Sequence, residues 1–212
     1  MEWSEKQLQI LSAAESLFAQ KGYEGTSVRD IAQKAEVNVA MISYYFGSKE
    51  KLLENLILQR TERTSIVLAG LSHDQQMDTW EKIDRIVDYY VDKMLDNRNF
   101  HTIISRQMSM TQDKAITEVL IRAKMTHSAM ITEIIREGQR RKIFRQVDVG
   151  LTIGTFLGTI SQVSMSRPFY CQLLKLDPED GEKYFKKMRA KLKPHLKALL
   201  RAHLSIENEK LS

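Results

Sequence analysis

Cysteine, proline and glycine are scarce in this chain of 212 residues, which holds one cysteine, three prolines and nine glycines. A single cysteine, Cys171, excludes a disulfide framework within the chain and a zinc site built on cysteines. The reduced cytoplasm is therefore the expected compartment. Few segments alternate β-branched residues at period two, and together with the low proline and glycine content this favours helices.

Long apolar runs are also missing. The most apolar stretch, residues 147–163, contains Asp148 and Gln162, and it is shorter than the roughly 20 apolar residues of a membrane span. The first five residues lack the basic and apolar regions of a signal peptide. Hydrophobic residues make up 42% of the chain, which is enough for a folded core. We expect a soluble cytoplasmic protein that does not bind a membrane.

Motifs for catalysis or cofactor binding are not found. The sequence has no H-E-x-x-H metal site, no P-loop and no glycine-rich dinucleotide loop after a strand. Glu133 and Glu137 share one helix face but lack the Glu-x-x-His partner of a di-iron bundle. We therefore predict no metal, no cofactor and no catalytic residue. An enzyme or small-molecule carrier built on a helical bundle is kept as an alternative.

Positive charge is concentrated at one end of the chain. The net charge is +5, yet residues 1–60 carry seven basic and eight acidic side chains. Residues 183–212 carry nine basic and two acidic side chains, and we interpret this tail as the solvated face of a helix. A nucleic-acid site in the first 60 residues must therefore depend on the arrangement of its side chains and not on bulk charge.

Capping signals predict three helices near the N-terminus. Ser4 and Gln7 can form a capping box at the start of a helix that ends near Lys21. A second capping box, Ser27 with Asp30, predicts a short second helix. Asn38 is a good N-cap for a third helix over Val39–Phe46. Two short helices joined by a short turn and leaning on a longer first helix form the helix-turn-helix plan.

Apolar periodicity predicts helices along the rest of the chain. A fourth helix begins at Ser48 and continues to about residue 69. The stretch from Pro168 to Gly181 is predicted as a break, and the last helix is expected to continue through Pro194. The fold class is all-α, with about nine helices, and the later ones are expected at residues 79–97, 99–110, 113–142, 148–166 and 182–205.

Three strings within residues 8–53 resemble the DNA-binding domain of the TetR (tetracycline-repressor-type) family. They are AAESLF at residues 13–18, GYEGTSVRDIA at residues 22–32 and YYFGSKEKL at residues 44–52. The resemblance implies a helix-turn-helix domain over residues 1–48. It also implies a helical ligand-binding and dimerisation domain over residues 49–212, which resembles the family only in length and helical layout.

The family's contact pattern implies a DNA-binding surface. Base edges are expected at Val39, Ala40 and Ser43, whose small side chains leave the third helix free to enter a major groove about 12 Å wide. Phosphates are expected at the two helix starts, where free backbone N–H groups favour an anion, and at two long hydroxyl-tipped side chains. A core role for Tyr45, a capping role for Asn38 and simple solvation of Lys49 are the alternatives. The phosphate set is Thr26, Ser27, Asn38, Tyr44, Tyr45 and Lys49.

Two departures from the family pattern affect the third helix and the turn before it. Many members have Lys or Arg in place of Val39 and Tyr in place of Ser43, so the surface here favours thymine methyl groups over guanine. Many members also have Gly in place of Glu36. If the turn demands a positive φ there, a non-glycine residue costs roughly 1 kcal/mol.

Small residues in the C-terminal part suggest a close helix contact. Gly150, Gly154 and Gly158 recur every four residues and share one helix face. The resemblance implies that the last two helices form a four-helix bundle across a two-fold axis, and hence a homodimer on a palindromic double-stranded operator. Close packing inside one subunit is the alternative. The matching face on the last helix is Met188, Leu192, Leu196 and Leu199.

Aromatic, methionine and histidine side chains are the candidates for a ligand pocket. Methionine adapts to many shapes and suits a permissive site for a small apolar or amphipathic ligand. The leading hypothesis is a homodimeric repressor that such a ligand releases from its operator. A regulator controlled by a partner protein, or by nothing, with the same side chains filling a core, remains open. The candidates are Trp80, Tyr89, Phe100, His101, Met108, Met125, His127 and Phe156.

Overall fold

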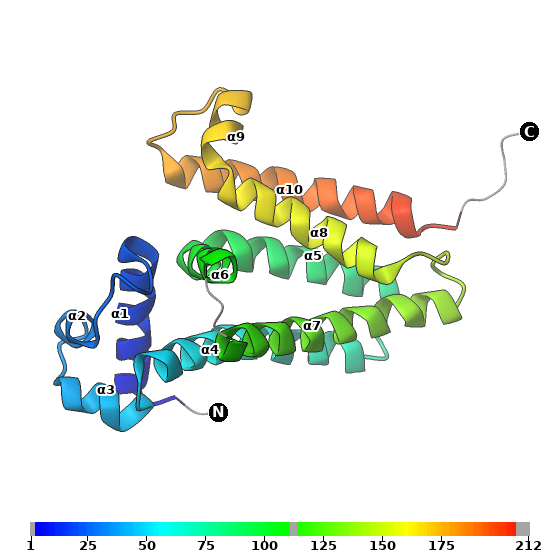
Figure 1. Ribbon diagram of the computed structural model, residues 1–212. Helices are drawn as coiled ribbons and strands as arrows, with labels where there is room; N and C mark the ends of the chain where they lie inside the picture. The colour runs from blue at the N-terminus through cyan, green and yellow to red at the C-terminus, as the bar shows by residue number, and fades with distance from the viewer. Residues whose placement is uncertain (1–2, 111–113, 207–212) are drawn as a thin grey trace, which may run out of the picture. The chain divides into compact units, whose positions relative to one another are not determined.

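The computed structural model describes residues 3–110 and 114–206, and it describes side chains outside residues 107–115. The described residues form ten helices, which confirms the all-α prediction (Figure 1). The expected start of the seventh helix at residue 113 lies outside the described residues. The helices are α1 Glu5–Lys21, α2 Val28–Lys34, α3 Val39–Phe46, α4 Lys49–His73, α5 Thr79–Asp96, α6 Arg98–Met110, α7 Lys114–Arg140, α8 Val149–Met165, α9 Arg167–Leu174 and α10 Gly181–Leu204.

The chain divides into two compact units. The first, called the head unit, comprises residues 1–65 and 98–125, and the second, the body unit, comprises residues 66–97 and 126–212. The head unit contains the expected domain of residues 1–48 and adds the first part of α4, α6 and the first part of α7. Both α4 and α7 therefore contribute residues to each unit.

The core of the head unit joins the helix-turn-helix to α6. Apolar side chains of α1, α2, α3 and α4 cluster with Phe100, Ile103 and Ile104 of α6. Arg106 of α6 donates from Nη1 to the carbonyl oxygen of Ala19 at 3.0 Å, at the C-terminal end of α1. Because free carbonyls at a helix C-terminus attract cations, this contact ties α6 to α1.

A buried ion pair holds α4 against α1 within the head unit. The carboxylate of Glu15 on α1 is buried, and Arg60 on α4 donates to its Oε2 from Nε at 2.7 Å. A buried carboxylate is costly unless it is paired. The pair therefore fixes where α4 leaves the helix-turn-helix.

The body unit is built around α5, α8 and α10, which pack against one another (Figure 1). Lys82 of α5 is 1% exposed and donates to Glu137 of α7 at 3.1 Å. Arg141 donates to the same carboxylate at 3.2 Å. Burial opposes ionisation of Glu137, but the hydrogen bond and charge of Lys82, with help from Arg141, lower its pKa. The charge of the buried lysine is thus paired with a carboxylate inside the body unit.

Four ion pairs connect α5 to α10 in an antiparallel ladder. The acidic residues on α5 and the basic residues on α10 each recur every four positions, so each set forms one row on its helix. This corrects the interpretation of the basic tail as a solvated face, because four of its cations face carboxylates. The pairs are Asp84–Arg201 at 2.8 Å, Asp88–Lys197 at 2.7 Å, Asp92–Lys193 at 2.8 Å and Asp96–Arg189.

The predicted break at residues 168–181 is wrong in part, because it contains α9. Pro168 lies in the first turn of α9, where a backbone N–H has no partner within the helix and its absence costs nothing. Lys175 adopts φ 52° and ends the helix. The expected continuity of α10 through Pro194 is confirmed. Across the described ranges, no helix is long and apolar enough to cross a membrane.

Candidate nucleic-acid interface

The start of α2 is fixed by a capping box. Ser27 accepts from the Asp30 N–H at 3.1 Å, while Asp30 accepts from the Ser27 hydroxyl at 2.7 Å and from its N–H at 2.9 Å. The hydroxyl and backbone hydrogen bonds from Ser27 lower the pKa of Asp30. Ser27 is exposed, but its hydroxyl already has partners at this helix start.

The turn between α2 and α3 contains a strained residue. Glu36 has φ 50°, the left-handed conformation that favours glycine. The turn is closed by hydrogen bonds from the Glu36 N–H to Gln33 O at 3.2 Å and from the Val37 N–H to Ala32 O at 3.0 Å. The condition under which a non-glycine residue is costly at this position is therefore met. Asn38 then caps α3 by accepting from the Ala40 N–H at 2.9 Å.

The exposed face of α3 collects the expected reading residues. Val39, Ala40, Ser43 and Tyr44 are all exposed, and Tyr44 is 82% exposed. The opposite face buries Ile42 and Phe46 in the core of the head unit. A short helix that carries small, uncharged side chains on its exposed side can enter the major groove.

Tyr45 differs from Tyr44. It is half-buried and packs against the core of the head unit, with its ring edge-on to Tyr44 at 5.1 Å between centroids. Tyr45 therefore supports Tyr44, whose ring projects into solvent beside the reading face.

Thr26 does not present its side chain at the surface. It is 1% exposed, and its hydroxyl donates to the carbonyl oxygen of Gly22 at 2.7 Å. The prediction that this side chain contacts a phosphate is therefore corrected, because its hydroxyl closes the turn between α1 and α2. Sequence alone placed Thr26 at a helix start but could not show that its side chain points inward.

Lys49 is half-buried and bound to the same turn. Its Nζ donates to Tyr23 O at 3.1 Å and to Thr26 O at 3.2 Å, and it lies 4.2 Å from the centre of the Tyr23 ring. The expected anion site at the start of α4 is partly occupied by the chain's own groups. The backbone N–H of Glu50 and the Ser48 hydroxyl lower the pKa of the Glu50 carboxylate.

Comparison with known proteins agrees with this geometry. Residues 10–56 match the family described as bacterial regulatory proteins, tetR family, and residues 76–165 match the tetracyclin repressor-like C-terminal domain. The HTH-type transcriptional repressor NicS of Pseudomonas putida is 30% identical over 148 residues, which cover 68% of this chain and 67% of NicS. The chain belongs to the TetR family. It is a transcriptional regulator, like the other members that it matches.

Other TetR-family matches extend over most of the chain. "Probable HTH-type transcriptional regulator YttP" of Bacillus subtilis is 29% identical over 180 residues, covering 84% of this chain and 86% of YttP. The structure of FadR from Bacillus subtilis in complex with stearoyl-CoA has a TM-score of 0.63 and 20% identity. It covers 86% of this chain and 96% of FadR. At that identity the likeness shows the shared TetR fold.

The expected ligand-pocket residues of this TetR member are divided between the two units. Phe100, His101 and Met125 belong to the head unit, where Phe100 is buried in the core and Met125 is exposed. The side chain of Met108 lies outside the described residues. The remaining four, Trp80, Tyr89, His127 and Phe156, belong to the body unit.

Within the body unit, the expected pocket residues mostly pack as core. Phe156 is buried with its ring 5.6 Å from that of Tyr90, and burial raises the pKa of Tyr90. Trp80 packs edge-on against Phe144 at 4.6 Å. Of the expected residues, Phe156 lines an internal cavity, and its volume is about 20 Å³, the size of one water.

The expected dimer residues of this TetR member separate into two groups. Gly150, Gly154 and Gly158 are exposed on α8, and a Cβ added at Gly154 or Gly158 would meet nothing within 4 Å. The prediction that this face of α10 forms the dimer interface is corrected, because the face packs into the chain's own core against α5 and α8. Its members Met188, Leu192 and Leu196 are buried, and Leu199 is half-buried.

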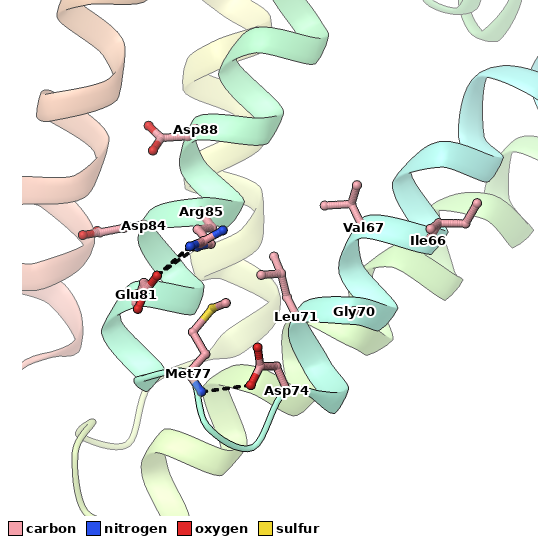
Figure 2. A pocket seen from close by; sticks show the side chains of 10 residues that line it. All are labelled: Ile66, Val67, Gly70, Leu71, Asp74, Met77, Glu81, Asp84, Arg85 and Asp88. Carbon is pink, nitrogen blue, oxygen red and sulfur yellow. Dashed lines mark hydrogen bonds and ion pairs between the residues drawn. The ribbon is translucent and has the colours of Figure 1, made fainter.

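Sequence reasoning missed a second pocket, an open cleft of about 740 Å³ in the body unit between α4 and α5. Figure 2 shows its lining, which comes from the last turns of α4, the connecting turn and the first half of α5. The signal was weak, because Ile66, Val67 and Leu71 resemble an ordinary helix face in the sequence.

Proposed function

We propose that this TetR-family regulator is a homodimeric repressor that reads a palindromic operator with its two α3 helices. The observation that supports the proposal is the exposed face of Val39, Ala40, Ser43 and Tyr44 on a helix fixed by caps and a buried core. In a two-fold dimer, the two reading helices would contact half-sites roughly one DNA turn, about 34–36 Å, apart or slightly further.

Selection from a random duplex library at fixed salt tests operator reading, because affinity for DNA depends steeply on salt. We expect a palindromic motif bound by two protomers. Tyr44→Ala removes one phosphate hydrogen bond from each protomer, so it should weaken binding to the selected palindrome by roughly 25- to 100-fold. Leu58→Ala, which truncates another exposed side chain of the head unit, is the matched control. Enrichment of a motif without two-fold symmetry would contradict the proposal.

The proposed dimer face lies on α8. The helix Val149–Met165 contains no charged residue, and its exposed side includes three glycines and Leu151, which is 72% exposed. A two-fold interface brings the same face of both subunits together, and residues near the axis meet their own copies, so an uncharged face avoids contact between like charges. The exposed face of α10 adds a second row of small residues at spacing four, Ala190, Pro194, Ala198 and Ala202.

Gly154→Arg tests this face without disturbing the subunit. A Cβ added at Gly154 meets nothing within 4 Å in one chain, and replacing glycine within a helix favours the helix. We expect the variant to sediment as a monomer and to lose high-affinity operator binding. Ala129→Arg, at a small exposed position of α7, is the control and should leave the dimer intact. A Gly154→Arg variant that remains a dimer would place the interface elsewhere.

Ligand release is the second half of the proposal. FadR of Bacillus subtilis was solved with stearoyl-CoA, and in this chain α4 and α7 each run through both units. A ligand that prefers one arrangement of the units would shift operator affinity by about 1–3 kcal/mol. Mass spectrometry of compounds that copurify, followed by operator binding with and without them, tests this step.

The internal cavity of about 20 Å³ favours a second candidate function, a TetR-family regulator whose core holds no small molecule. It would be supported if no compound copurified and no tested compound changed operator affinity.

A further inference from the structure

The helix α3 carries no side chain that can make a bidentate hydrogen bond with a base. Its sequence is VAMISYYF, which contains no Arg, Lys, Asn, Gln, Asp, Glu or His. Arg and Lys recognise guanine, and Asn and Gln recognise adenine, each through two hydrogen bonds in the major groove. Ser43 offers one hydroxyl, and a serine hydroxyl bonds to bases of more than one kind. Hydrogen bonds from α3 therefore discriminate only weakly between base pairs.

The amide side chain that precedes α3 is used to cap the helix. Asn38 Oδ1 accepts the N–H of Ala40 at 2.9 Å. A bidentate contact with adenine needs the amide oxygen and the amide nitrogen of one side chain together, so the cap competes directly with such a contact. The last two cations before α3, Arg29 and Lys34, lie on α2, and the first helix of this motif crosses the phosphate backbone.

The start of α3 presents a small apolar surface instead. Val39 and Ala40 are the first two residues of the helix, and both are exposed, Val39 at 39%. In a helix-turn-helix, the N-terminal residues of the second helix face the base edges. Ala40 has no rotamer to fix, and a valine within a helix has one strongly preferred rotamer. An apolar group can therefore pack on these two side chains at little cost in side-chain entropy.

Buried side chains and backbone hydrogen bonds hold this surface in place. Ile42 and Phe46 are buried in the core of the head unit, and the Met41 N–H donates to Asn38 O at 2.9 Å. Attraction between two apolar groups falls by roughly a quarter to a half when the gap between them widens by about 0.5–1 Å. A surface fixed in this way is suited to detecting a single methyl group.

We infer that α3 recognises the C5 methyl group of a pyrimidine through Val39 and Ala40. Among the four bases, only thymine carries a methyl group in the major groove, so each half-site is expected to place a thymine against these residues. 5-Methylcytosine carries the same group on the same ring atom and is expected to replace thymine there. The inference rests on the proposed reading of an operator, and it specifies which chemical group of the operator is read.

Deoxyuridine tests the inference, because it differs from thymidine only by the missing methyl group. Thymines of the selected operator are replaced by deoxyuridine, one symmetric pair at a time, and affinity is measured at one fixed salt concentration. Loss of one buried methyl contact lowers affinity roughly fourfold, so the pair that faces the two α3 helices should lower it roughly 15-fold. Half-sites without thymine, or effects below about twofold at every pair, would overturn the inference.

Cytosine and 5-methylcytosine separate the methyl group from the shape of the DNA. At the sensitive pair, T·A is replaced by C·G and by 5-methylcytosine·G, which share their hydrogen-bonding groups and differ by the methyl group. The methylated operator should bind roughly 15-fold more tightly than the unmethylated one. Equal binding of the two would assign the thymine preference to sequence-dependent DNA shape and would overturn the inference.

Variants locate the contact on the protein. Val39→Ala removes part of the apolar surface, and the thymidine and deoxyuridine operators should then differ by about threefold or less. Val39→Thr keeps the shape of the side chain and one of its methyl groups, and it should give an intermediate difference. Leu58→Ala truncates an apolar side chain of similar exposure, 42%, outside α3, and it should retain the full difference. A difference that stays near 15-fold in both Val39 variants would mean that the methyl group is read elsewhere.

The same measurements distinguish this inference from the proposed function. A palindromic operator whose affinity does not change with deoxyuridine would leave the proposed function standing and overturn the inference. A motif without two-fold symmetry that loses roughly fourfold in affinity on a single replacement would contradict the proposed dimeric reading and leave the methyl contact standing.

Discussion

Lys49→Met separates the two roles open to this lysine. In the structure its ammonium group is bound to the turn between α1 and α2, through Tyr23 O, Thr26 O and the Tyr23 ring. Methionine keeps the length of the apolar stem and removes the charge. If the contacts with the turn are its main role, the substitution should lower the stability of the head unit. The number of operator phosphates that the protein contacts should not change.

The size of the loss follows from the contacts. Two hydrogen bonds from a charged donor are worth about 1.5 kcal/mol each at the low end, and the contact with the Tyr23 ring adds about 0.5 kcal/mol. Lys49 is half-buried, so water can satisfy part of what the two carbonyls lose. We expect the free energy of unfolding to fall by about 2–3 kcal/mol, which lowers the melting temperature by roughly 5–10 °C.

The two tryptophans allow the head unit to be observed alone. Trp3 belongs to the head unit and Trp80 to the body unit. In a Trp80→Phe background, urea unfolding followed by Trp3 fluorescence reports the head unit. Lys51→Met, at an exposed neighbour whose ammonium pairs with Glu54 within its own helix, is the control. It should change stability by no more than about 0.5 kcal/mol.

The salt dependence of operator binding tests the other role, a contact between Lys49 and a phosphate. Loss of one phosphate contact reduces the slope of log affinity against log salt by about 0.9. For Lys49→Met we expect an unchanged slope at temperatures where the head unit is folded. Lys49→Met removes one lysine from each protomer, so unchanged stability with a slope reduced by about 1.8 would refute the reasoning and would assign Lys49 to a phosphate.

Four further predictions concern stability and are measured by urea unfolding. Glu36→Gly should stabilise the head unit by about 0.5–1 kcal/mol by relieving the positive φ, and Glu36→Ala, which keeps the strain, should not. Glu137→Gln should cost about 2–3 kcal/mol by leaving a buried ammonium poorly paired, whereas Lys82→Met should cost less than about 1 kcal/mol. Gly138→Ala should cost about 2–3 kcal/mol, because the added Cβ would lie 2.2 Å from the ring of Phe144. The pKa of Glu137 is lowered in the folded chain. Ionised Glu137 therefore stabilises the fold above the ordinary pKa of 4.5, and this stabilisation is lost as the pH falls through the lowered pKa. The Glu137→Gln variant should not show that loss.

The helix-turn-helix could be predicted from sequence because its signals are local. The capping box of Ser27 with Asp30 and the Asn38 cap depend on residues two or three positions apart, and each formed as predicted. The positive φ of Glu36 was considered only as a condition, and the structure shows that the turn meets this condition. Such features are fixed by neighbouring residues, so no knowledge of distant packing is needed.

The inclusion of α6 in the head unit could not be predicted in this way. The spacing of Phe100, Ile103 and Ile104 shows that α6 has one apolar face, but it does not say which helix covers that face. Their partners on α1 lie more than 80 residues away in the sequence. The same limit explains why Phe100 was expected in a ligand pocket when it fills the core of the head unit.

The ladder between α5 and α10 shows where a longer-range signal was available. Four acidic residues at spacing four on one helix and four basic residues at spacing four on another form all four pairs in only one antiparallel register. That pairing turns the apolar row next to the basic residues, with Met188 and Leu192, toward α5 and into the core. Apolar phase alone could not distinguish an inward face from a dimer face, because both are apolar. The charges decide it, and the row left outward on α10 is the one of alanines and Pro194, whose small side chains match the glycine row of α8 in letting a second helix approach closely.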